Sequence, residues 1–305
     1  MPKTIRIGTR DSELAMWQAR TVENSLRALG YKTELVPTKS AGDVILDKPL
    51  YEFGITGIFT KTLDVAMISG QVDIAVHSMK DVPTALPHGI VQAAVIKREN
   101  PVDILVHKGN LDFTDVCTIA TGSLRRQAQW LHRYPHHSTV DLRGNVNTRL
   151  QKLHDSDWTG AIFATAGLDR LGIKPDNSIA LDWMISAPAQ GAMMVVAMAN
   201  DDFCRDAVAK LNHFDTEVCT FVERQFLRTL EGGCTAPIGA LAQIEGNEIR
   251  FEGALFSLDG REKIHIEKSA PATHYKEFGL ECAHDVLSGG GDSLMRRIKT
   301  EMNKS

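Results

Sequence analysis

A chain of 305 residues, 43% hydrophobic and 24% charged, has enough apolar side chains for a folded core and room for two or three domains. Its formal net charge of -4 excludes a general polyanion-binding surface, so any anion site must be local. No apolar run is long enough for a signal sequence or a membrane span, which predicts a cytoplasmic protein with no membrane or nucleic-acid partner.

Strand and helix patterns alternate through the first hundred residues. Strands are expected at residues 4–8, 32–37 and 72–76, and helices at residues 13–29 and 59–68. The strand at residues 72–76 is almost entirely apolar, which is typical of a sheet covered on both faces. This part of the chain is therefore predicted to form an α/β lobe.

The same alternation resumes from Asp103, after a polar segment at residues 96–101 that we interpret as a crossing into a second lobe. Strands are expected at residues 117–121, 139–142 and 160–165, alternating with helices at residues 124–134, 146–154 and 166–171. An apolar strand at residues 193–199 would return the chain to the first lobe. Two crossings would form a hinge, so the pattern predicts two periplasmic-binding-protein-like α/β lobes.

The last third of the chain has a different pattern. A helix from about Asp215 to the glycine pair at residues 232–233 precedes three strands, at residues 238–244, 248–258 and 262–268. Tight-turn sequences, Gly246-Asn247 and Asp259-Gly260, separate these strands. With a helix at residues 273–287 and a final helix, they predict a small α+β domain with a three-stranded antiparallel sheet. The predicted domains are residues 1–96 with 191–213, residues 97–190, and residues 214–305.

Four strand ends in the two lobes share one design, in which a small or polar residue caps the next turn and a cation lies beside it. Ligands of open α/β sheets bind at this edge, because helix N-termini and loops converge there. We favour an anion site for the set, although any single arginine could instead form a surface salt bridge. The four segments are Thr9-Arg10-Asp11-Ser12, Ser78-Met79-Lys80, Thr121-Gly122-Ser123-Leu124-Arg125-Arg126 and Asp141-Leu142-Arg143-Gly144-Asn145.

Arg125 and Arg126 are the most informative members of this set. Cations in the first turn of a helix oppose its dipole, so two of them there indicate an anion that joins them. Arg149 and Arg170 could add to the same cluster. Arginine favours planar carboxylates or phosphates, and the absence of GxxxxGK[ST] and GxGxxG motifs disfavours nucleotide phosphate.

Asp81 differs in charge from the neighbouring Lys80. It either pairs with the cations of this edge or faces a donor or a developing positive charge on the ligand, and the sequence alone leaves both open. His77 is expected to pack at a strand end, and the pair His136-His137 to lie in a solvated loop.

The five cysteines are odd in number and far apart, which disfavours both a disulfide framework and a zinc site. We expect reduced thiols and no metal. Cys234, in the segment Leu230-Glu231-Gly232-Gly233-Cys234, lies on a bend between a helix and a strand. A lone cysteine commonly acts as a small buried hydrophobic residue. An unpaired thiol that neighbouring glycines leave accessible is also typical of a point of covalent attachment.

Several of these segments, taken together and in order, resemble the porphobilinogen deaminases, also called hydroxymethylbilane synthases. The resemblance covers residues 5–240, and the remainder matches by architecture more than by motif. The segments are Gly8-Thr9-Arg10 with Leu14-Ala15-Met16-Trp17-Gln18-Ala19, Gly42-Asp43-Val44-Ile45-Leu46-Asp47, His77-Ser78-Met79-Lys80-Asp81-Val82-Pro83, Ser123-Leu124-Arg125-Arg126-Gln127, Arg143-Gly144-Asn145-Val146 with Thr148-Arg149-Leu150, Ala189-Gln190-Gly191-Ala192 and Leu230-Glu231-Gly232-Gly233-Cys234.

The resemblance implies a dipyrromethane cofactor, assembled from substrate and joined by a thioether to Cys234. It implies porphobilinogen as the substrate, a pyrrole with acetate, propionate and aminomethyl groups. The protein would be a monomeric transferase of tetrapyrrole and haem biosynthesis. It would expel ammonia at each condensation and release hydroxymethylbilane by hydrolysis.

The resemblance also implies roles for single residues. Asp81 would hydrogen-bond the pyrrole N–H groups and stabilise developing positive charge. The family often has a second lysine five residues before Lys61; this chain has Thr56 there, so the carboxylate contact of that lysine is not carried over. The other cofactor-binding residues would be Ser78, Lys80, Thr121, Ser123, Arg125, Arg126, Arg143 and Gly144, and the substrate-binding residues Arg10, Lys61, Arg149, Arg170 and Gln190.

A non-catalytic, two-lobed binder of an organic anion is the alternative function. It would explain the hinge and the arginines but not Cys234. A nucleic-acid binder is disfavoured by the acidic balance of the chain and the lack of interleaved aromatic residues.

Overall fold

The computed structural model describes residues 3–39, 60–109, 111–230 and 236–303. These residues form two compact units. The first contains residues 3–39, 60–99 and 191–218, and the second contains the remaining described residues. The chain leaves the first unit after Glu99 and returns to it at Gly191, which are close to the predicted crossings. The finer division of the second unit, into residues 97–190 and 214–305, stays a prediction.

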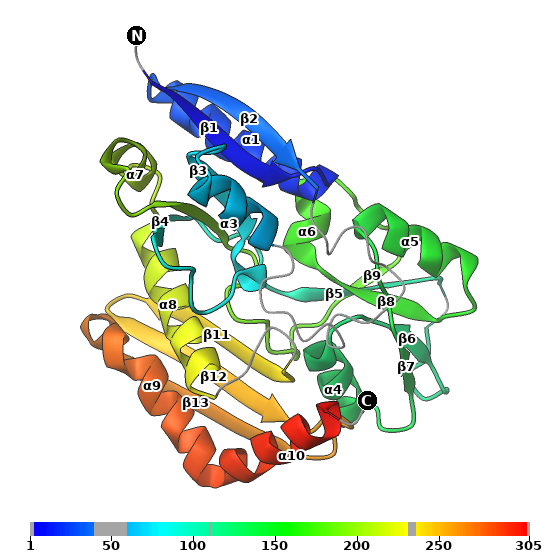
Figure 1. Cartoon of the computed structure of the whole chain (residues 1–305). Coiled ribbons are helices and arrows are strands. Elements are labelled where there is room, and N and C mark those ends of the chain that lie inside the picture. The colour runs from blue at the N-terminus through cyan, green and yellow to red at the C-terminus, as the bar shows by residue number, and fades with distance from the viewer. Residues whose placement is uncertain (1–2, 40–59, 110, 231–235, 304–305) are drawn as a thin grey trace. The chain divides into compact units, whose positions relative to one another are not determined.

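A five-stranded sheet forms the centre of the first unit (Figure 1). Strand β1 runs parallel to β2 and β3, whereas β10 is antiparallel to its neighbours β3 and β4. The order is β2-β1-β3-β10-β4, with β1 at Thr4–Arg10, β2 at Lys32–Thr38, β3 at Ile74–Ser78, β4 at Ile90–Ile96 and β10 at Met193–Met198.

Helices cover both faces of this sheet. Helices α1 (Glu13–Ala28) and α7 (Asp202–Ala209) share one apolar cluster with Ile5 and Ile7 of β1. The next residue, Gly8, faces the other way, where an added Cβ would lie 3.0 Å from Leu63 of α3 (Lys61–Ile68). The small residue therefore lets α3 approach β1 closely.

The second unit contains a five-stranded sheet with the same arrangement, in the order β7-β6-β8-β5-β9. Here β6 is parallel to β7 and β8, and β5 is antiparallel to β8 and β9. In both sheets, the strand in the fourth position of the spatial order, β10 or β5, is the first strand that the chain forms after it crosses between the units. The strands are β5 (Asp103–His107), β6 (Thr118–Ala120), β7 (Ser138–Val140), β8 (Gly160–Ala164) and β9 (Ser178–Ala180). This confirms the predicted pair of periplasmic-binding-protein-like α/β lobes.

The two faces of this second sheet have separate cores. Helix α4 (Leu124–Arg133) packs through Trp130 on one face, and α5 (Val146–Asp155) with α6 (Thr165–Arg170) covers the other. His137 belongs to the first core, because its ring stacks on Tyr134 and its Nδ1 accepts a hydrogen bond from Trp130 at 3.2 Å. The expectation of a solvated loop is therefore correct for the exposed His136 and wrong for His137.

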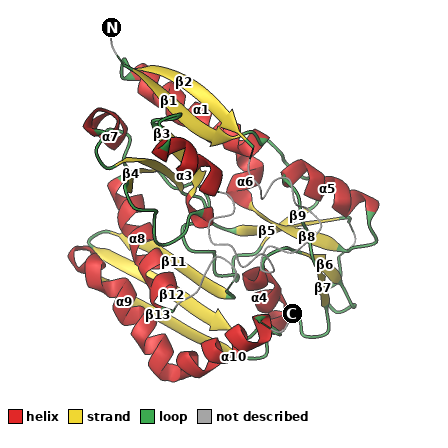
Figure 2. Ribbon diagram, viewed as in Figure 1, coloured by secondary structure: helices red, strands yellow, loops and turns green. Residues whose placement is uncertain are grey.

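The C-terminal part of the second unit is the predicted α+β domain. Helices α8 (Phe214–Thr229) and α9 (Tyr275–Val286) lie along one face of its antiparallel sheet (Figure 2). Phe251 of the sheet contacts Phe226 of α8 and Phe278 of α9 edge to face. The sheet consists of β11 (Ile238–Glu245), β12 (Glu248–Phe256) and β13 (Lys263–Pro271), and α10 (Asp292–Met302) follows α9.

Glu223 joins the second crossing segment to this C-terminal sheet. Its side chain is fully buried, and its two carboxylate oxygens accept hydrogen bonds from the backbone N–H groups of Ala189 and Ala242, each at 2.7 Å. Ala189 has a φ of 62°, a conformation that costs a non-glycine residue about 1 kcal/mol or more. The buried carboxylate helps to hold this strained turn in place.

The periodicity did not predict the strands β4, β5 and β9 or the helix α7. On α1, Ala15 and Gln18 are buried, whereas Leu14 and Trp17 are half-buried. No helix in the described part of the chain has the length and apolar character needed to cross a membrane.

Candidate functional site

The first unit brings two predicted strand ends together. Strands β1 and β3 are parallel neighbours, so Arg10 and Ser78 lie at the same edge of the sheet. The hydroxyl of Ser78 accepts a hydrogen bond from Nε2 of the buried Gln18 at 2.8 Å. Since the amide occupies a lone pair of Ser78, the serine O–H proton remains available to an acceptor such as a carboxylate.

A short 3-10 turn, Met79–Asp81, follows β3. Its backbone is fixed on one side by Met79, whose N–H donates to the carbonyl of Ala192 at 3.0 Å and whose side chain is buried. Lys80 and Asp81 are half-buried. The turn therefore carries an ammonium group and a carboxylate on consecutive residues, and both side chains are partly exposed to solvent.

His77 is buried beside this turn. Burial, and secondly the positive charge of Arg10, lower the pKa of His77 from 6.5 to about 4. The imidazole is therefore neutral at physiological pH, and it adds no charge to the cations of this edge.

Lys61 begins α3 and is exposed. Thr56, where the family often has a lysine, lies outside the described residues.

The second unit brings together the ends of its parallel strands β6 and β7. Thr121, after β6, is buried, and its hydroxyl accepts a hydrogen bond from the N–H of Ser123 at 3.3 Å. Gly122 passes so close to the β7 end that an added Cβ would lie 2.5 Å from the carbonyl oxygen of Leu142. The two loops therefore touch through backbone, which fixes Ser123 at the N-terminus of α4.

The loop after β7 carries Arg143 and Gly144. Gly144 has a φ of 118°, and Asn145 caps α5 by accepting a hydrogen bond from the N–H of Thr148. The Nε of Arg149, one turn into α5, donates to the Gly144 carbonyl at 2.7 Å. Burial lowers the pKa of Arg143, and the charge of Asp141 partly offsets this effect.

Arg125 and Arg126 lie in the first turn of α4, and both are buried. The anion that joins them is a residue of the chain itself, Asp103 at the start of β5. Arg126 donates to Oδ1 of Asp103 through Nε and Nη2, at 3.0 and 2.7 Å, and Nη1 of Arg125 lies 2.7 Å from Oδ2. The sequence predicted that an anion joins the two arginines and did not identify Asp103, which fills this role within the chain; a ligand anion at this position stays a prediction.

The remaining predicted residues of this unit are also buried. Arg170 is in the last turn of α6, where a cation is favoured by the helix dipole. Gln190 is completely buried at the second crossing, and its Nε2 donates to Oδ1 of Asp103 at 2.8 Å. The second unit therefore unites Arg125, Arg126 and Gln190 around one carboxylate.

Sequence models of one protein family match most of this chain. Residues 5–206 match the sequence model described as "Porphobilinogen deaminase, dipyromethane cofactor binding domain", and residues 217–288 match "Porphobilinogen deaminase, C-terminal domain". The chain belongs to the porphobilinogen deaminase family. The prediction of the family is confirmed.

Relatives in this family match along nearly the whole chain. The porphobilinogen deaminase of Pelotomaculum thermopropionicum is 39% identical over 99% of both chains. That of Pelobacter propionicus is 40% identical over 97% of this chain and 98% of its own. Among solved structures, an ABC transporter periplasmic substrate-binding protein from Coxiella burnetii is 13% identical, with a TM-score of 0.43, over 68% of this chain and 91% of that one.

Cys234 lies outside the described residues. The other four cysteines of this family member are all buried, and none of the four forms a disulfide. Burial raises the pKa of Cys117, and it raises the pKa of Cys204 and of Cys282 to about 12. Because a thiol reacts as its thiolate, these three are poor nucleophiles.

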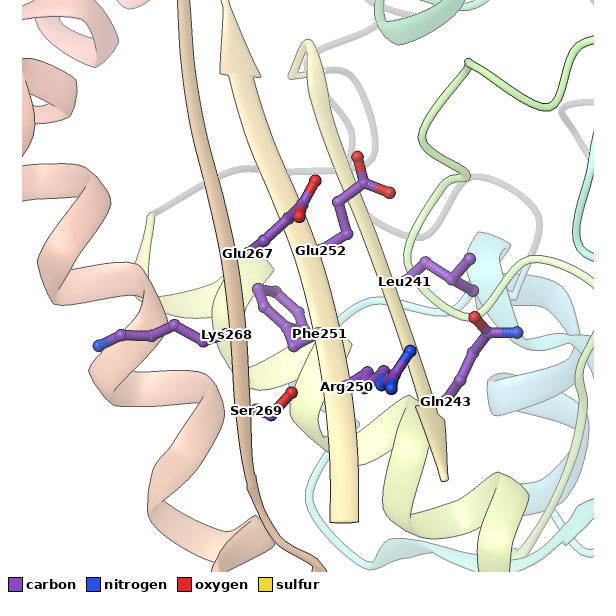
Figure 3. A pocket seen from close by; sticks show the side chains of 8 residues that line it. All are labelled: Leu241, Gln243, Arg250, Phe251, Glu252, Glu267, Lys268 and Ser269. Carbon is purple, nitrogen blue, oxygen red and sulfur yellow. The ribbon is translucent and has the colours of Figure 1, made fainter. Parts of the chain in front are cut away.

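A hollow on the C-terminal sheet contains none of the predicted site residues. Figure 3 shows Glu252 and Glu267 pointing to the same side of the sheet and Lys268 pointing toward α9, where it pairs with Asp285. His265 lies beside the two glutamates, with Nε2 2.9 Å from Glu252. These contacts are ion pairs between partly exposed side chains of the C-terminal domain, which contribute little to stability.

Sequence reasoning missed Gln18 and Asp103. Gln18 lies inside a motif of the family resemblance, but its amide was not connected with Ser78. Asp103 could have been noticed as a carboxylate at the start of an apolar strand, where burial predicts a cationic partner.

His77 predicts a pH dependence of stability. Its folded pKa of about 4 lies below the unfolded value, so between these values the unfolded chain binds a proton that the folded chain does not. Stability is therefore lost as the pH falls through this window. Urea unfolding of the original chain and of His77→Gln should show that the gap between their unfolding free energies shrinks by about 2 kcal/mol from pH 7 to pH 5. His284→Gln, at an exposed position of α9, controls for the substitution, and a constant gap would contradict the assignment.

Gly144 predicts a local steric effect. An alanine Cβ there would lie 2.8 Å from Cγ2 of Thr148 and would also have to adopt a positive φ. Gly144→Ala should lower the unfolding free energy by about 2–4 kcal/mol. The matched control is Gly172→Ala, with a φ of 67° and no atom within 4 Å of the added Cβ, which should lose only about 1 kcal/mol. Equal losses in urea titrations of the two variants would show that the Thr148 contact is unimportant.

Proposed function

We propose that this chain is a porphobilinogen deaminase that condenses porphobilinogen head to tail and releases hydroxymethylbilane. In each condensation, the amino group of the aminomethyl substituent of a porphobilinogen takes up a proton and leaves as ammonia, which breaks the bond between its nitrogen and the methylene carbon. Its methylene carbon forms a bond to the free α-carbon of the growing chain, which loses a proton. Water completes the cycle by hydrolysing the product from the enzyme.

The observation that carries this proposal is the match of both family domains, which together cover most of the chain, and of relatives along nearly its whole length. The residues present also fit a carboxylate-rich cofactor. The guanidinium of Arg125 is buried, and its Nε has no hydrogen-bond partner among the described residues. An unsatisfied buried donor is unfavourable, and a ligand carboxylate would satisfy it.

A dipyrromethane group joined to Cys234 would supply the primer on which the chain grows. The buried, weakly acidic thiols of Cys117, Cys204 and Cys282 support Cys234 as the attachment point.

The other residues would bind, orient and stabilise. Asp81 would accept hydrogen bonds from pyrrole N–H groups and stabilise positive charge that develops as ammonia leaves. Its half-buried position at the end of a fixed turn supports this role, because the carboxylate is both accessible and restrained. Carboxylates of the cofactor would bind to Ser78, Lys80, Thr121, Ser123, Arg125, Arg126, Arg143 and Gly144, and those of the substrate to Arg10, Lys61, Arg149 and Arg170. Gln190, predicted as a further substrate-binding residue, would instead support the site indirectly, because its side chain is buried and its Nε2 donates to Pro101 and Asp103.

The alternative of a non-catalytic anion binder is not favoured, since the family matches extend through the C-terminal domain as well. We also propose a monomer in the cytoplasm. The four free cysteines are consistent with a reducing compartment.

Removing the proposed attachment point provides the first test. Cys234→Ala should carry no covalent adduct in the intact mass of the denatured protein, whereas the original chain and the buried-thiol control Cys282→Ala should both carry one. Ammonia release from porphobilinogen should be lost with the adduct. An adduct on Cys234→Ala, or active original protein without any adduct, would refute the attachment.

Asp81 provides the second test. Asp81→Asn keeps the size of the side chain but removes its charge, so it should slow ammonia release by about a hundredfold or more while much of the adduct remains. Asp64→Asn, at another half-buried position of the first unit, is the control. Rates of Asp81→Asn within a few fold of the original would remove its proposed charge role.

A further inference from the structure

Asp103 is a fully buried carboxylate with an unusual number of partners. Its Oδ1 accepts from Nε and Nη2 of Arg126 and from Nε2 of Gln190, while its Oδ2 pairs with Nη1 of Arg125. These four contacts are between 2.7 and 3.0 Å long. One side chain therefore fixes the direction of two guanidinium groups and one amide.

Charge explains why this carboxylate is needed. Two adjacent guanidinium groups are buried at a helix N-terminus, where the dipole and their mutual repulsion both disfavour them. Burial lowers the pKa of Arg125, the charge of Asp103 raises it, and the charge of Arg126 lowers it again. Asp103 neutralises one of the two cations, so these three side chains taken together keep a positive charge that favours an anionic ligand.

The hydrogen-bond donors of the two arginines are used unequally. Each of the three nitrogens of Arg126 has a partner within the chain, because Nη1 donates to the Ile162 carbonyl at 3.0 Å. Arg125 donates through Nη1 to the Ile185 carbonyl at 2.7 Å, but its buried Nε has no hydrogen-bond partner among the described residues. The network thus holds Arg126 on three sides and leaves an unused donor on Arg125.

The same carboxylate is linked to both crossing segments. Gln190, which precedes the return to the first unit, donates to the carbonyl of Pro101 at 2.6 Å as well as to Asp103. Ser186 donates to the Pro101 carbonyl at 2.7 Å. Both segments therefore have fixed positions relative to the arginine pair within the second unit.

We propose that Asp103 is a positioning residue for carboxylate binding. It holds Arg125 and Arg126 in the arrangement in which they receive a carboxylate of the cofactor or the growing chain, and Gln190 shares this support. The proposal rests on the proposed function, but it concerns a residue that would not touch the ligand.

Changing Asp103 to Asn has a defined consequence. The amide keeps one acceptor oxygen, but its NH2 group would face a guanidinium N–H, and two buried cations would lose their counter-charge. The arginines would then move apart or toward solvent. Asp103→Glu keeps the charge and moves the carboxylate by one methylene, so its effect should be intermediate.

Asp73→Asn is the matched control. Asp73 is also buried and pairs with an arginine, Arg6, through both carboxylate oxygens, but it belongs to the first unit and has no predicted role in the site. Both substitutions should lower the melting temperature. Only the loss of Asp103 should change the site.

The experiment measures adduct occupancy from intact mass, and KM and kcat for ammonia release on the loaded fraction. Asp103→Asn should have at least fivefold lower occupancy and at least tenfold higher KM, with a smaller change in kcat. Asp73→Asn should stay within twofold of the original in occupancy and KM, and Asp103→Glu should fall between the two. A purely structural role would lower yield and melting temperature without separating KM from kcat.

Two results would overturn the proposal: occupancy and KM of Asp103→Asn within twofold of the original, or equal losses in Asp73→Asn. If Asp103→Asn gives no folded protein, Asp103→Glu decides by the same measures, and values within twofold of the original reject positioning. An original chain with neither adduct nor ammonia release would reject the proposed function instead. A loaded, active chain that tolerates both substitutions rejects this inference alone.

Discussion

The burial of charge at Asp103 is the constraint on which the second unit depends most. A carboxylate without water is stable only if cations and N–H groups surround it, and this requirement brings the start of β5, the first turn of α4 and the second crossing together. The geometry is specific because the donors are rigid. Two planar guanidinium groups and an amide can satisfy a single carboxylate in few arrangements.

Glu223 is a second buried carboxylate, and its hydrogen-bond donors are backbone N–H groups. It holds the N–H of Ala189, whose backbone is strained, and the N–H of Ala242 in β11. Gln190, the next residue after Ala189, is held by Asp103. Two buried carboxylates from different elements therefore act on consecutive residues of the same turn. Strain of this kind persists only where the surroundings over-determine the backbone, and here two hydrogen-bond networks do so.

The alternation of strands and helices was sufficient to predict both α/β sheets, because long apolar strands and amphipathic helices carry periodic patterns that survive in one sequence. β9, with three exposed residues, has no such pattern. The position of Asp103 indicated that it needs a cationic partner, but its pairing with Arg125 and Arg126 was not predictable. Asp103 lies about twenty residues earlier in the chain, and it comes near them only because β5 pairs antiparallel with β8. His137 was misjudged for the same reason: its burial depends on Phe113, Trp130 and Tyr134, which the fold assembles around it.

The predicted site residues fall into two physical groups. Ser78, Lys80, Asp81 and Arg149 are half-buried, so they can meet a ligand with little rearrangement. Arg125, Arg126, Arg143 and Arg170 are buried, and the ion pairs of Arg125 and Arg126 with Asp103 offset part of the desolvation of these two guanidinium groups. A carboxylate bound at these residues, as proposed, would meet cations that have lost much of their hydration and have fixed directions, so each new hydrogen bond would be stronger than one made to a mobile surface arginine. A net-acidic protein can hold a carboxylate-rich ligand in this way, because local preorganisation outweighs its overall charge.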